Sequence, residues 1–456
     1  MVYAKIRYVA MRHSLLTIVL LLASSAVHAE GTAFVNVNVV PMTSEIVIEQ
    51  QTVVVEKGRI KAIGPVDEVP IPEDARVIDG TDRYLMPGLA ETHAHVPDSD
   101  SPNLDRNFSL YVANGVTTVR GMLGHPSHLD LRQDLLDGKV FGPRLYTSGP
   151  SLNGRSVNGP GHARQLVEEQ HAAGYDFIKV HPGLSSDEFE ALAQTANALG
   201  MPYAGHVPVA AGVLRALELN MASIDHLDGY FAALLPANSD GSGGYGGFFD
   251  VMLADELETG HIAEIASATA KAGTWNVPTE VLVELRVDET PVSELRNWPE
   301  MRYMPAATVR RWVEAKESVL EASDFDPEVA ALAIEIRRRL ILELQRAGAG
   351  LLLGSDSPQV FNVPGFSIHR ELDALVSAGL TPFEALRTGT VAVDEFLGSN
   401  TGIVAVGREA DLVLLDANPL VDILNSRRIH GVMVRGNWHS AAILTERLNP
   451  YLGDRD

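Results

Sequence analysis

The sequence contains no cysteine. This absence excludes disulfide bonds, zinc sites built from thiolates and catalysis by a cysteine nucleophile. Positive charge is also scarce, because 36 lysine and arginine residues stand against 59 aspartate and glutamate residues and leave a formal net charge of −23. An acidic chain of this kind is poorly suited to bind nucleic acid or an anionic membrane surface, so we expect neither partner.

The apolar run near the N-terminus, residues 15–23, is too short for a comfortable membrane span. Val27-His28-Ala29 follows it and supplies a cleavage site before Glu30, and three basic residues precede it, Lys5, Arg7 and Arg12. We therefore predict a signal peptide over residues 1–29 and a periplasmic or secreted protein. No cysteine follows to carry a lipid, so we expect no membrane anchor. Met11 is an alternative start that would give a more compact signal.

The two ends of the chain share the alternating pattern of short strands. Residues 33–40 and 51–56 alternate near the N-terminus, and residues 410–416 and 429–436 do so near the C-terminus. Two β-rich segments on either side of a long middle predict one small sheet domain assembled from both ends of the chain, residues 30–83 and 400–456.

The middle of the chain, residues 84–399, alternates short apolar segments with helical patterns such as residues 186–199 and 208–219. This alternation is typical of βα units around a parallel sheet. After a first strand that ends near residue 96, we count seven more, at residues 116–120, 144–149, 177–181, 202–207, 223–227, 274–279 and 350–356. Eight βα units of this total length predict an α/β fold of the (β/α)8 TIM-barrel class.

Two insertions follow the sixth and seventh predicted strands, at residues 229–273 and 280–345. The first carries the glycine-rich stretch 240–247, and the second is mostly helical in pattern. Both would lie on the C-terminal face of a barrel, where barrel active sites lie. They are either a solvated loop with outer helices or a mobile lid with a pocket wall.

The first predicted barrel strand ends in Thr92-His93-Ala94-His95. Side chains at i and i+2 of a strand point to the same face, so the two histidines can reach one metal ion, although they can also be two unrelated polar residues. Polar side chains recur where later strands end, at Lys179, His206, His226 and Asp356. These strand ends would converge on one mouth, and so much unpaired polarity is costly to bury as mere packing.

Lys179 lies in an apolar segment, residues 176–181. Its ammonium group would be repelled by bound cations. Two interpretations remain open at this point. Lys179 either pairs with a nearby carboxylate, or it reacts with CO2 and becomes a carbamylated lysine, an anionic oxygen ligand that can bridge two metals.

These motifs together resemble the amidohydrolase superfamily, over nearly the whole chain after residue 29. The likeness is closest to imidazolonepropionase-like and Xaa-Pro dipeptidase-like members. The residues that carry it are Met86-Pro87-Gly88-Leu89, Thr92-His93-Ala94-His95, Asn114-Gly115-Val116-Thr117-Thr118-Val119-Arg120, Phe177-Ile178-Lys179-Val180, Gly205-His206, Ser223-Ile224-Asp225-His226, Gly354-Ser355-Asp356 and residues 407–415.

The resemblance implies a barrel with a composite β-sandwich and a site for two divalent metal ions, usually Zn²⁺. The first ion would be held by His93, His95 and Asp356, and the second by His206 and His226, with carbamylated Lys179 as the bridging ligand. The sequence departs from the family pattern at Gly121, where the family often has aspartate, and at Val207-Pro208. Both departures concern substrate identity and leave the metal ligands intact.

A metal-bridging hydroxide would then be the attacking group, because two cations lower the pKa of a shared water and polarise the scissile carbonyl. Asp356 would act as general base and acid and pass the proton to the leaving amine, unless it is a metal ligand only. Mononuclear deaminases and imidazolonepropionases of the superfamily generally lack the strand-4 lysine. Lys179 therefore favours a binuclear hydrolase of amide bonds over a deaminase.

Other polar residues are weaker candidates for substrate binding. His181 lies two residues after Lys179 on the same predicted strand, and we include three more positions near the ends of other strands, Arg120, His162 and His369. The run Arg337-Arg338-Arg339 is interpreted as a helix face in solvent, with a single substrate-facing arginine as the alternative.

The sequence as a whole predicts a metal-dependent amidohydrolase that cleaves an amide or peptide-like bond in a small molecule, such as a dipeptide or an N-acyl amino acid. A hydrolase of cyclic amides, lactones or esters at the same site is the runner-up. A catalytically silent binding protein would require a broken ligand set, and all six positions are present. Proteins of this type often form homo-oligomers, but no sequence feature identifies an interface, and fold alone does not fix the substrate.

Overall fold

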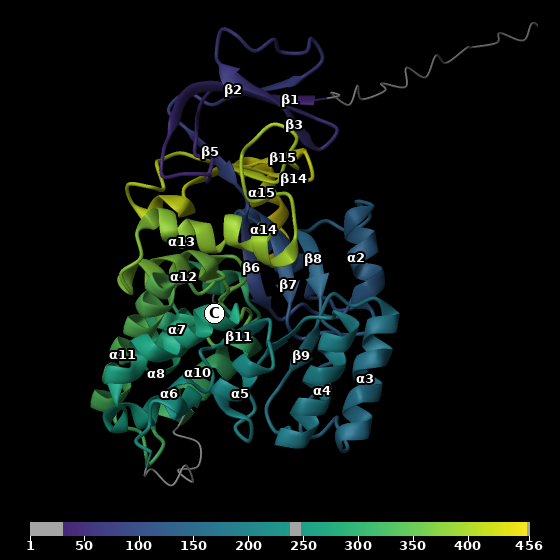
Figure 1. Cartoon of the computed structure of the whole chain (residues 1–456). Helices are drawn as coiled ribbons and strands as arrows, with labels where there is room; N and C mark the ends of the chain where they lie inside the picture. The colour runs from purple at the N-terminus through teal and green to yellow at the C-terminus, as the bar shows by residue number, and fades with distance from the viewer. Residues whose placement is uncertain (1–30, 238–247, 454–456) are drawn as a thin grey trace, which may run out of the picture.

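The computed structural model describes residues 31–237 and 248–453 of the chain. The predicted signal peptide at residues 1–29 and the glycine-rich stretch at residues 240–247 lie outside the described residues. Figure 1 shows strands from both ends of the chain gathered at the top of the molecule, above a larger body of helices and parallel strands. Among the helices that the structure describes, none is long and apolar enough to cross a membrane.

One eight-stranded sheet joins the two ends of the chain. Its order is β15-β14-β13-β5-β1-β2-β3, with β4 paired to β1. The N-terminal segment supplies β1 (Gly31–Val39), β2 (Ile48–Glu56), β3 (Arg59–Pro65), β4 (Arg76–Asp79) and β5 (Tyr84–Pro87). The C-terminal segment supplies β13 (Leu412–Leu415), β14 (Ile429–Val434) and β15 (Asn437–Ser440). The antiparallel pairing of β13 with β5 is the seam between the two segments, and it shows that the sheet extends past the predicted boundary at residue 83.

Apolar side chains from both segments form the core of this sheet. Phe34 and Val53 from the N-terminal segment pack in one buried cluster with Leu412 and Trp438 from the C-terminal segment. The rings of Phe34 and Trp438 meet edge to face, with their centroids 5.2 Å apart. Because each segment covers apolar surface of the other, neither can bury its own residues alone.

Seven short strands form two parallel sheets. One sheet contains β6 (Leu89–Ala94), β7 (Val116–Gly121) and β8 (Arg144–Thr147), and the other contains β9 (Ile178–Val180), β10 (Tyr203–Gly205), β11 (Ser223–Asp225) and β12 (Trp275–Val277). Single parallel bridges connect β8 and its following residues to the β9 region, at Ser148–Phe177 and Leu152–Val180. The strands that end in the predicted site residues are therefore neighbours in one parallel array.

The eighth predicted strand, residues 350–356, is not a regular strand. Leu351 forms a single parallel bridge to Asn276 of β12, and Ser357 forms one to Ala94 of β6. Between these bridges the backbone turns, because Asp356 adopts a φ of 59°. A side chain at Gly354 would approach His93 N to 2.9 Å, so this close approach requires glycine. The segment still links β12 to β6, but as two bridges around a turn.

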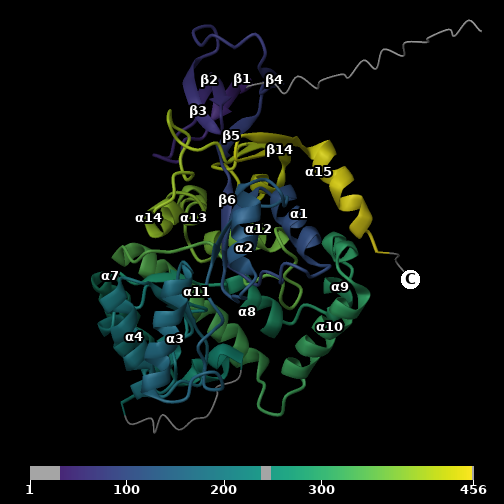
Figure 2. The same cartoon turned by 90° about the vertical axis from the view of Figure 1, so that its right-hand side faces the viewer.

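Helices follow the parallel strands, as the sequence predicts. They are α1 (Leu104–Ala113), α2 (His128–Leu136), α3 (Pro160–Ala173), α4 (Ser186–Leu199), α5 (Gly212–Glu218), α12 (Phe366–Ser377), α13 (Pro382–Thr388) and α14 (Val391–Leu397). Helix α4 coincides with the predicted range because Ser185 and Glu188 form a capping box at its start and Gly200 ends it in a left-handed conformation. Helices α3 and α4 run side by side (Figures 1 and 2).

The two predicted insertions are helical in the described residues. The first contains α6 (Tyr230–Ala233), the 3-10 segments η1 (Phe248–Glu256) and η2 (Thr259–His261), and α7 (Ile262–Ala272). The second contains α8 (Glu280–Val287), α9 (Val292–Leu295), η3 (Pro299–Tyr303), α10 (Ala306–Leu320) and α11 (Pro327–Ala347). Figure 2 shows α9 and α10 below the C-terminal α15 (Ala441–Leu448), which η5 (Asn449–Tyr451) follows. One more 3-10 segment, η4 (Ile423–Arg427), precedes β14.

Candidate metal centre

His93, His95 and Asp356 form a compact group of possible metal ligands. One ligand atom from each lies within 4.8 Å of the others. Nε2 of His95 is 3.1 Å from Oδ1 of Asp356, and Nε2 of His93 is 3.6 Å from the same oxygen. The two histidines leave β6 on the same face, as expected for residues i and i+2 of a strand. The positive φ of Asp356 turns its carboxylate toward them.

His226 and His206 extend this group from the ends of β11 and β10. The ring centroid of His226 lies 4.6 Å from that of His93 and 4.6 Å from that of His206. Its Nε2 is 4.0 Å from Oδ2 of Asp356. The ring of Phe249, from η1, stacks over His226 with centroids 4.7 Å apart. Four imidazoles and one carboxylate thus form a continuous cluster, with an aromatic ring from the first insertion over it.

The Nδ1 atoms of these histidines face groups of the protein. Nδ1 of His206 contacts the Asp228 carboxylate at 2.6 Å, and Nδ1 of His226 contacts Thr279 Oγ1 at 2.7 Å. Nδ1 of His93 lies 3.0 Å from Oδ2 of Asp225, off the line of an ideal hydrogen bond. Partners of this kind fix the ring orientation of a metal-binding histidine and leave Nε2 free for the ion.

Three buried polar atoms in the cluster have no hydrogen-bond partner of good geometry among the described residues, namely Nδ1 of His93, Nε2 of His226 and Oδ1 of Asp356. Buried nitrogen and oxygen atoms without partners are costly, and such a site commonly holds an ion or water. Imidazole nitrogen and carboxylate oxygen are ordinary zinc ligands. The residues present therefore fit a divalent cation in this cluster.

Asp225 was not singled out from the sequence, yet its carboxylate contacts a cluster histidine and two buried cations. Its carboxylate is fully buried and lies 3.1 Å from Nζ of Lys179 and 3.3 Å from Nη2 of Arg120. Burial by itself would raise the pKa of Asp225, but Lys179, His93 and Arg120 together hold it well below its usual value. The sequence signal was its place in β11, where the i, i+2 alternation puts it on one face with Ser223, another contact of Arg120.

The model of the Amidohydrolase family matches residues 84–439. An enamidase from Eubacterium barkeri is 23% identical over 379 residues, which cover 81% of this chain and 82% of that protein. An ochratoxinase from Aspergillus niger is 23% identical over 408 residues, which cover 74% and 71% of the two chains.

Solved structures show the same fold. A bottromycin amidohydrolase superposes with a TM-score of 0.72 at 24% identity and covers 93% of this chain and 91% of its own. A Xaa-Pro dipeptidase with bound methionine superposes with a TM-score of 0.62 at 18% identity and covers 90% of this chain and 100% of its own.

The chain belongs to the amidohydrolase family. The resemblance stated from the sequence is therefore confirmed, and the protein is a hydrolase of the carbon–nitrogen class, in a family that is generally metal-dependent. The mixed α/β content and the fold of its structural neighbours agree with the predicted class.

The structure corrects the prediction that Arg120 of this amidohydrolase binds substrate. Arg120 is 0% exposed, and its three guanidinium nitrogens donate to protein atoms. Nε donates to the carbonyl of Thr92, Nη1 to Ser223 Oγ, and Nη2 to Asp225 Oδ1. No substrate can reach it, so Arg120 is a positioning residue that ties β6 and β7 to β11.

His369 is likewise buried and engaged elsewhere. Its Nδ1 contacts Ser426 Oγ and its Nε2 contacts the carbonyl of Asn114, so it ties α12 to η4 and to the end of α1. The prediction of a substrate contact is corrected here too. His162 lies in the first turn of α3, where its Nδ1 accepts a hydrogen bond from the backbone of Asn158, and no contact with the histidine cluster is found for it in the described part of the chain.

His181 is the substrate-binding candidate that lies beside the cluster. Its ring stacks on His206 with centroids 5.1 Å apart and an interplanar angle of 28°. Burial, together with Lys179 and the neighbouring histidines, lowers the pKa of His181, so its ring is neutral at physiological pH. A neutral imidazole at this edge can donate or accept one hydrogen bond.

Arg337 was predicted to lie on a solvated helix face, and this prediction was wrong. Only 2% of Arg337 is exposed. Its guanidinium donates to Glu280 Oε2 and to the carbonyl oxygens of His226 and Pro278. Arg337 therefore holds the backbone of a cluster residue in place, which sequence periodicity alone could not reveal because its partners lie 57 to 111 residues away.

Proposed function

We propose that this amidohydrolase hydrolyses an amide or peptide-like bond of a small molecule, such as a dipeptide or an N-acyl amino acid. The observation that carries this proposal is the convergence of four imidazoles and Asp356, in which Nε2 of His226 and Oδ1 of Asp356 have no hydrogen-bond partner among the described residues. Relatives named for acting on enamide, dipeptide and ochratoxin substrates support the reaction class.

We propose further that the cluster holds two divalent ions, most simply Zn²⁺. His93, His95 and Asp356 would hold the first, His206 and His226 the second, and carbamylated Lys179 would bridge them. When bound, such ions polarise a carbonyl and acidify a coordinated water. The support for this assignment is the neutral state that burial imposes on the rings, because burial lowers the pKa of His93 and His226 well below the usual value and that of His95 to about 4.

Asp356 is the proposed proton carrier. Burial raises the pKa of its carboxyl group above the ordinary value, which the opposing charge of Lys179 does not cancel. A carboxylate with a raised pKa can accept a proton from the attacking water and donate it to the leaving nitrogen as the C–N bond breaks. The His181 ring, which stacks on His206, would orient the substrate amide.

The proposal includes a modified Lys179. Without modification its Nζ lies 3.1 Å from Oδ2 of Asp225, which is the carboxylate pairing that the sequence left open. The Lys179 side chain is 0% exposed, so a carbamate on Nζ would be shielded from solvent. Enzyme prepared with ¹³C-bicarbonate and zinc should show a carbamate carbon resonance, and Lys179→Ala should abolish it. Absence of this resonance in the active enzyme would exclude the carbamate.

Metal content and turnover test the function directly. Elemental analysis should find about two ions in each chain, and a panel of dipeptides and N-acyl amino acids should show release of an amino acid that a chelator suppresses. Lys179→Ala should lose one or both ions and activity, whereas Lys316→Ala, which removes another buried lysine outside the cluster, should retain both ions. Two retained ions with full activity in Lys179→Ala would contradict the binuclear assignment, and turnover of cyclic amides or esters alone would replace the substrate class.

We propose that β6 to β12 and residues 351–357 form the eight-stranded ring of a (β/α)8 barrel over residues 84–399, and that the sheet shared by the chain ends is the composite β-sandwich domain. The parallel bridges on both sides of β9 to β12 support this closure. We also propose export to the periplasm or medium with cleavage after residue 29. N-terminal sequencing of protein from cell fractions should begin at Glu30; an intact N-terminus in the cytoplasm would refute export.

A further inference from the structure

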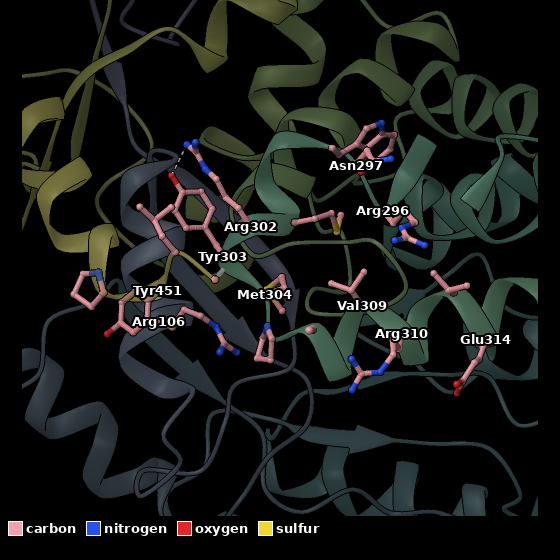
Figure 3. A pocket seen from close by; sticks show the side chains of 18 of the residues that line it. Arg106, Arg296, Asn297, Arg302, Tyr303, Met304, Val309, Arg310, Glu314 and Tyr451 are labelled. Atoms are coloured by element: carbon pink, nitrogen blue, oxygen red, sulfur yellow. Dashed lines mark hydrogen bonds between the residues drawn. The ribbon is translucent and has the colours of Figure 1, made fainter. Parts of the chain in front are cut away.

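Another cavity has a volume of about 920 Å³. Figure 3 shows it from close by. Its walls are the first turn of α1, the segment from η3 into α10, and the residues around η5. None of the histidine-cluster residues lines it. A volume of this size is within the usual range for sites that bind small organic molecules.

Arg106 is an unusual member of this wall. Only 8% of it is exposed, and its buried Nε has no hydrogen-bond partner among the described residues. The adjacent carboxylate, Asp105, does not neutralise it, because Asp105 is engaged by Arg447 and by the hydroxyl of Tyr451. Burial accordingly lowers the pKa of Arg106. A buried guanidinium without an anion is costly, and that cost falls when an anion binds.

The rest of the wall has the composition of a site for an amphipathic anion. Figure 3 shows Arg106 and Arg310 extending toward the cavity from opposite sides, while Arg302 turns to the hydroxyl of Tyr303. Four arginines and two glutamates line the cavity, which is a positive balance in a chain whose net charge is −23. The apolar side chains of the wall include Met301, Met304, Val309 and Val313.

We propose that this cavity is a second binding site, specific for an organic monocarboxylate with an apolar body. The guanidinium of Arg106 would receive the carboxylate, and the methionine and valine side chains would cover the body. A guanidinium fork matches a carboxylate in a planar, two-bond geometry. Because a single arginine is buried and Glu314 and Glu317 share the wall, a monoanion fits better than a phosphate dianion. This site is independent of the proposed hydrolysis.

Titration calorimetry with 3-phenylpropanoate tests the proposal. The full chain is used in the presence of chelator, so that carboxylates do not bind at metal ions. Arg106→Gln should weaken binding by about 10- to 100-fold, the value of one charge-assisted hydrogen-bond pair. Arg164→Gln, a charge removal at an exposed position on α3, should leave binding unchanged. The neutral amide of the probe should bind at least tenfold more weakly than the acid, and phenyl phosphate should bind more weakly than the carboxylate.

Several outcomes would overturn the proposal. Equal binding to wild type and Arg106→Gln would place the probe elsewhere, provided that both melt at similar temperatures. Arg310→Gln is the second variant, at an exposed position of the rim, and should weaken binding by a few-fold without affecting folding. Absence of binding together with a dimer that Met304→Glu dissociates would assign this face to a second copy of the chain.

Discussion

Replacement of Asp225 by asparagine should destabilise this amidohydrolase strongly, although asparagine has nearly the same shape. The Asp225 carboxylate is fully buried and faces Lys179 Nζ at 3.1 Å and Arg120 Nη2 at 3.3 Å. Removing one partner from a buried ion pair leaves uncompensated charge and costs about 3–5 kcal/mol. The loss in free energy of unfolding should fall in this range.

The pH dependence of this loss follows from the depressed pKa of Asp225. A carboxyl group whose pKa is lower in the folded state contributes stability that is present above the unfolded-state pKa and is lost as the pH falls through the folded-state value. The difference in free energy of unfolding between wild type and Asp225→Asn should therefore be constant from about pH 5 to about pH 8, because this range lies above the ordinary aspartate pKa of about 3.9. Below that range the difference should shrink.

Urea unfolding followed by the fluorescence of the four tryptophans measures this loss. Asp228→Asn is the matched control, because its carboxylate also contacts a cluster histidine but lies in a partly exposed position without a buried cation. It should cost roughly 1 kcal/mol, the usual size of one hydrogen bond. An Asp225→Asn variant that unfolds at the wild-type urea concentration would refute the argument about buried charge.

Zinc affinity provides a second measurement on the same variant. Asp225 lies 3.0 Å from Nδ1 of His93, and loss of such an orienting partner typically weakens metal binding by about 10- to 100-fold. If Lys179 is carbamylated in the metal-loaded enzyme, it no longer presents a cation to Asp225. The stability loss should then be smaller with zinc and bicarbonate than without them. An equal loss under both conditions would indicate that Lys179 remains an ammonium group.

Three further predictions follow from buried contacts. Arg337→Met should lower the free energy of unfolding by about 3–5 kcal/mol, because it leaves the buried Glu280 unpaired. Urea midpoints measure this change, and a loss under about 1 kcal/mol would contradict the importance of the buried ion pair. Gly354→Ala should reduce metal content and activity with less effect on secondary structure, because its Cβ would approach His93 N to 2.9 Å; full zinc occupancy would argue against that close packing. His369→Gln should make the free energy of unfolding less dependent on pH between 6.5 and 3. Burial lowers the pKa of His369 from 6.5 to about 3, so the stability that this neutral ring contributes to the wild type is fully present above pH 6.5 and is lost as the pH falls. Urea midpoints at about pH 6.5, 5.5 and 4.5 should show a shallower slope for the variant, and parallel slopes would refute this prediction.

Local sequence patterns predicted much of the secondary structure. Strand alternation at both chain ends predicted that the two ends contribute to one region, and β13 does pair with β5. The capping residues Ser185 and Glu188 made α4 predictable to the residue. The His-x-His motif predicts two neighbouring metal ligands because strand geometry places both side chains on one face. In each case the information lies within a few residues, so chain periodicity suffices.

Contacts between distant residues were not predictable in the same way. The ring of contacts through Asp225 joins β6, β7, β9 and β11, and Arg120 and Lys179 reach it across 105 and 46 residues. Arg337 carries the same helical pattern as a solvated arginine, and its burial depends on the packing of α11 against other elements such as α7 and α8.

The sequence by itself therefore determined which residue types arrive at the carboxyl ends of the strands and that both chain ends form strands. Only the tertiary structure decided which polar groups face a ligand and which are paired inside the protein. The physical reason is that hydrophobic periodicity records burial along one element, whereas the pairing of a buried charge depends on which other elements pack against it. Arg120 and Arg106 illustrate the difference: both are buried arginines on neighbouring elements, and the fold supplies a carboxylate to the first and a cavity to the second.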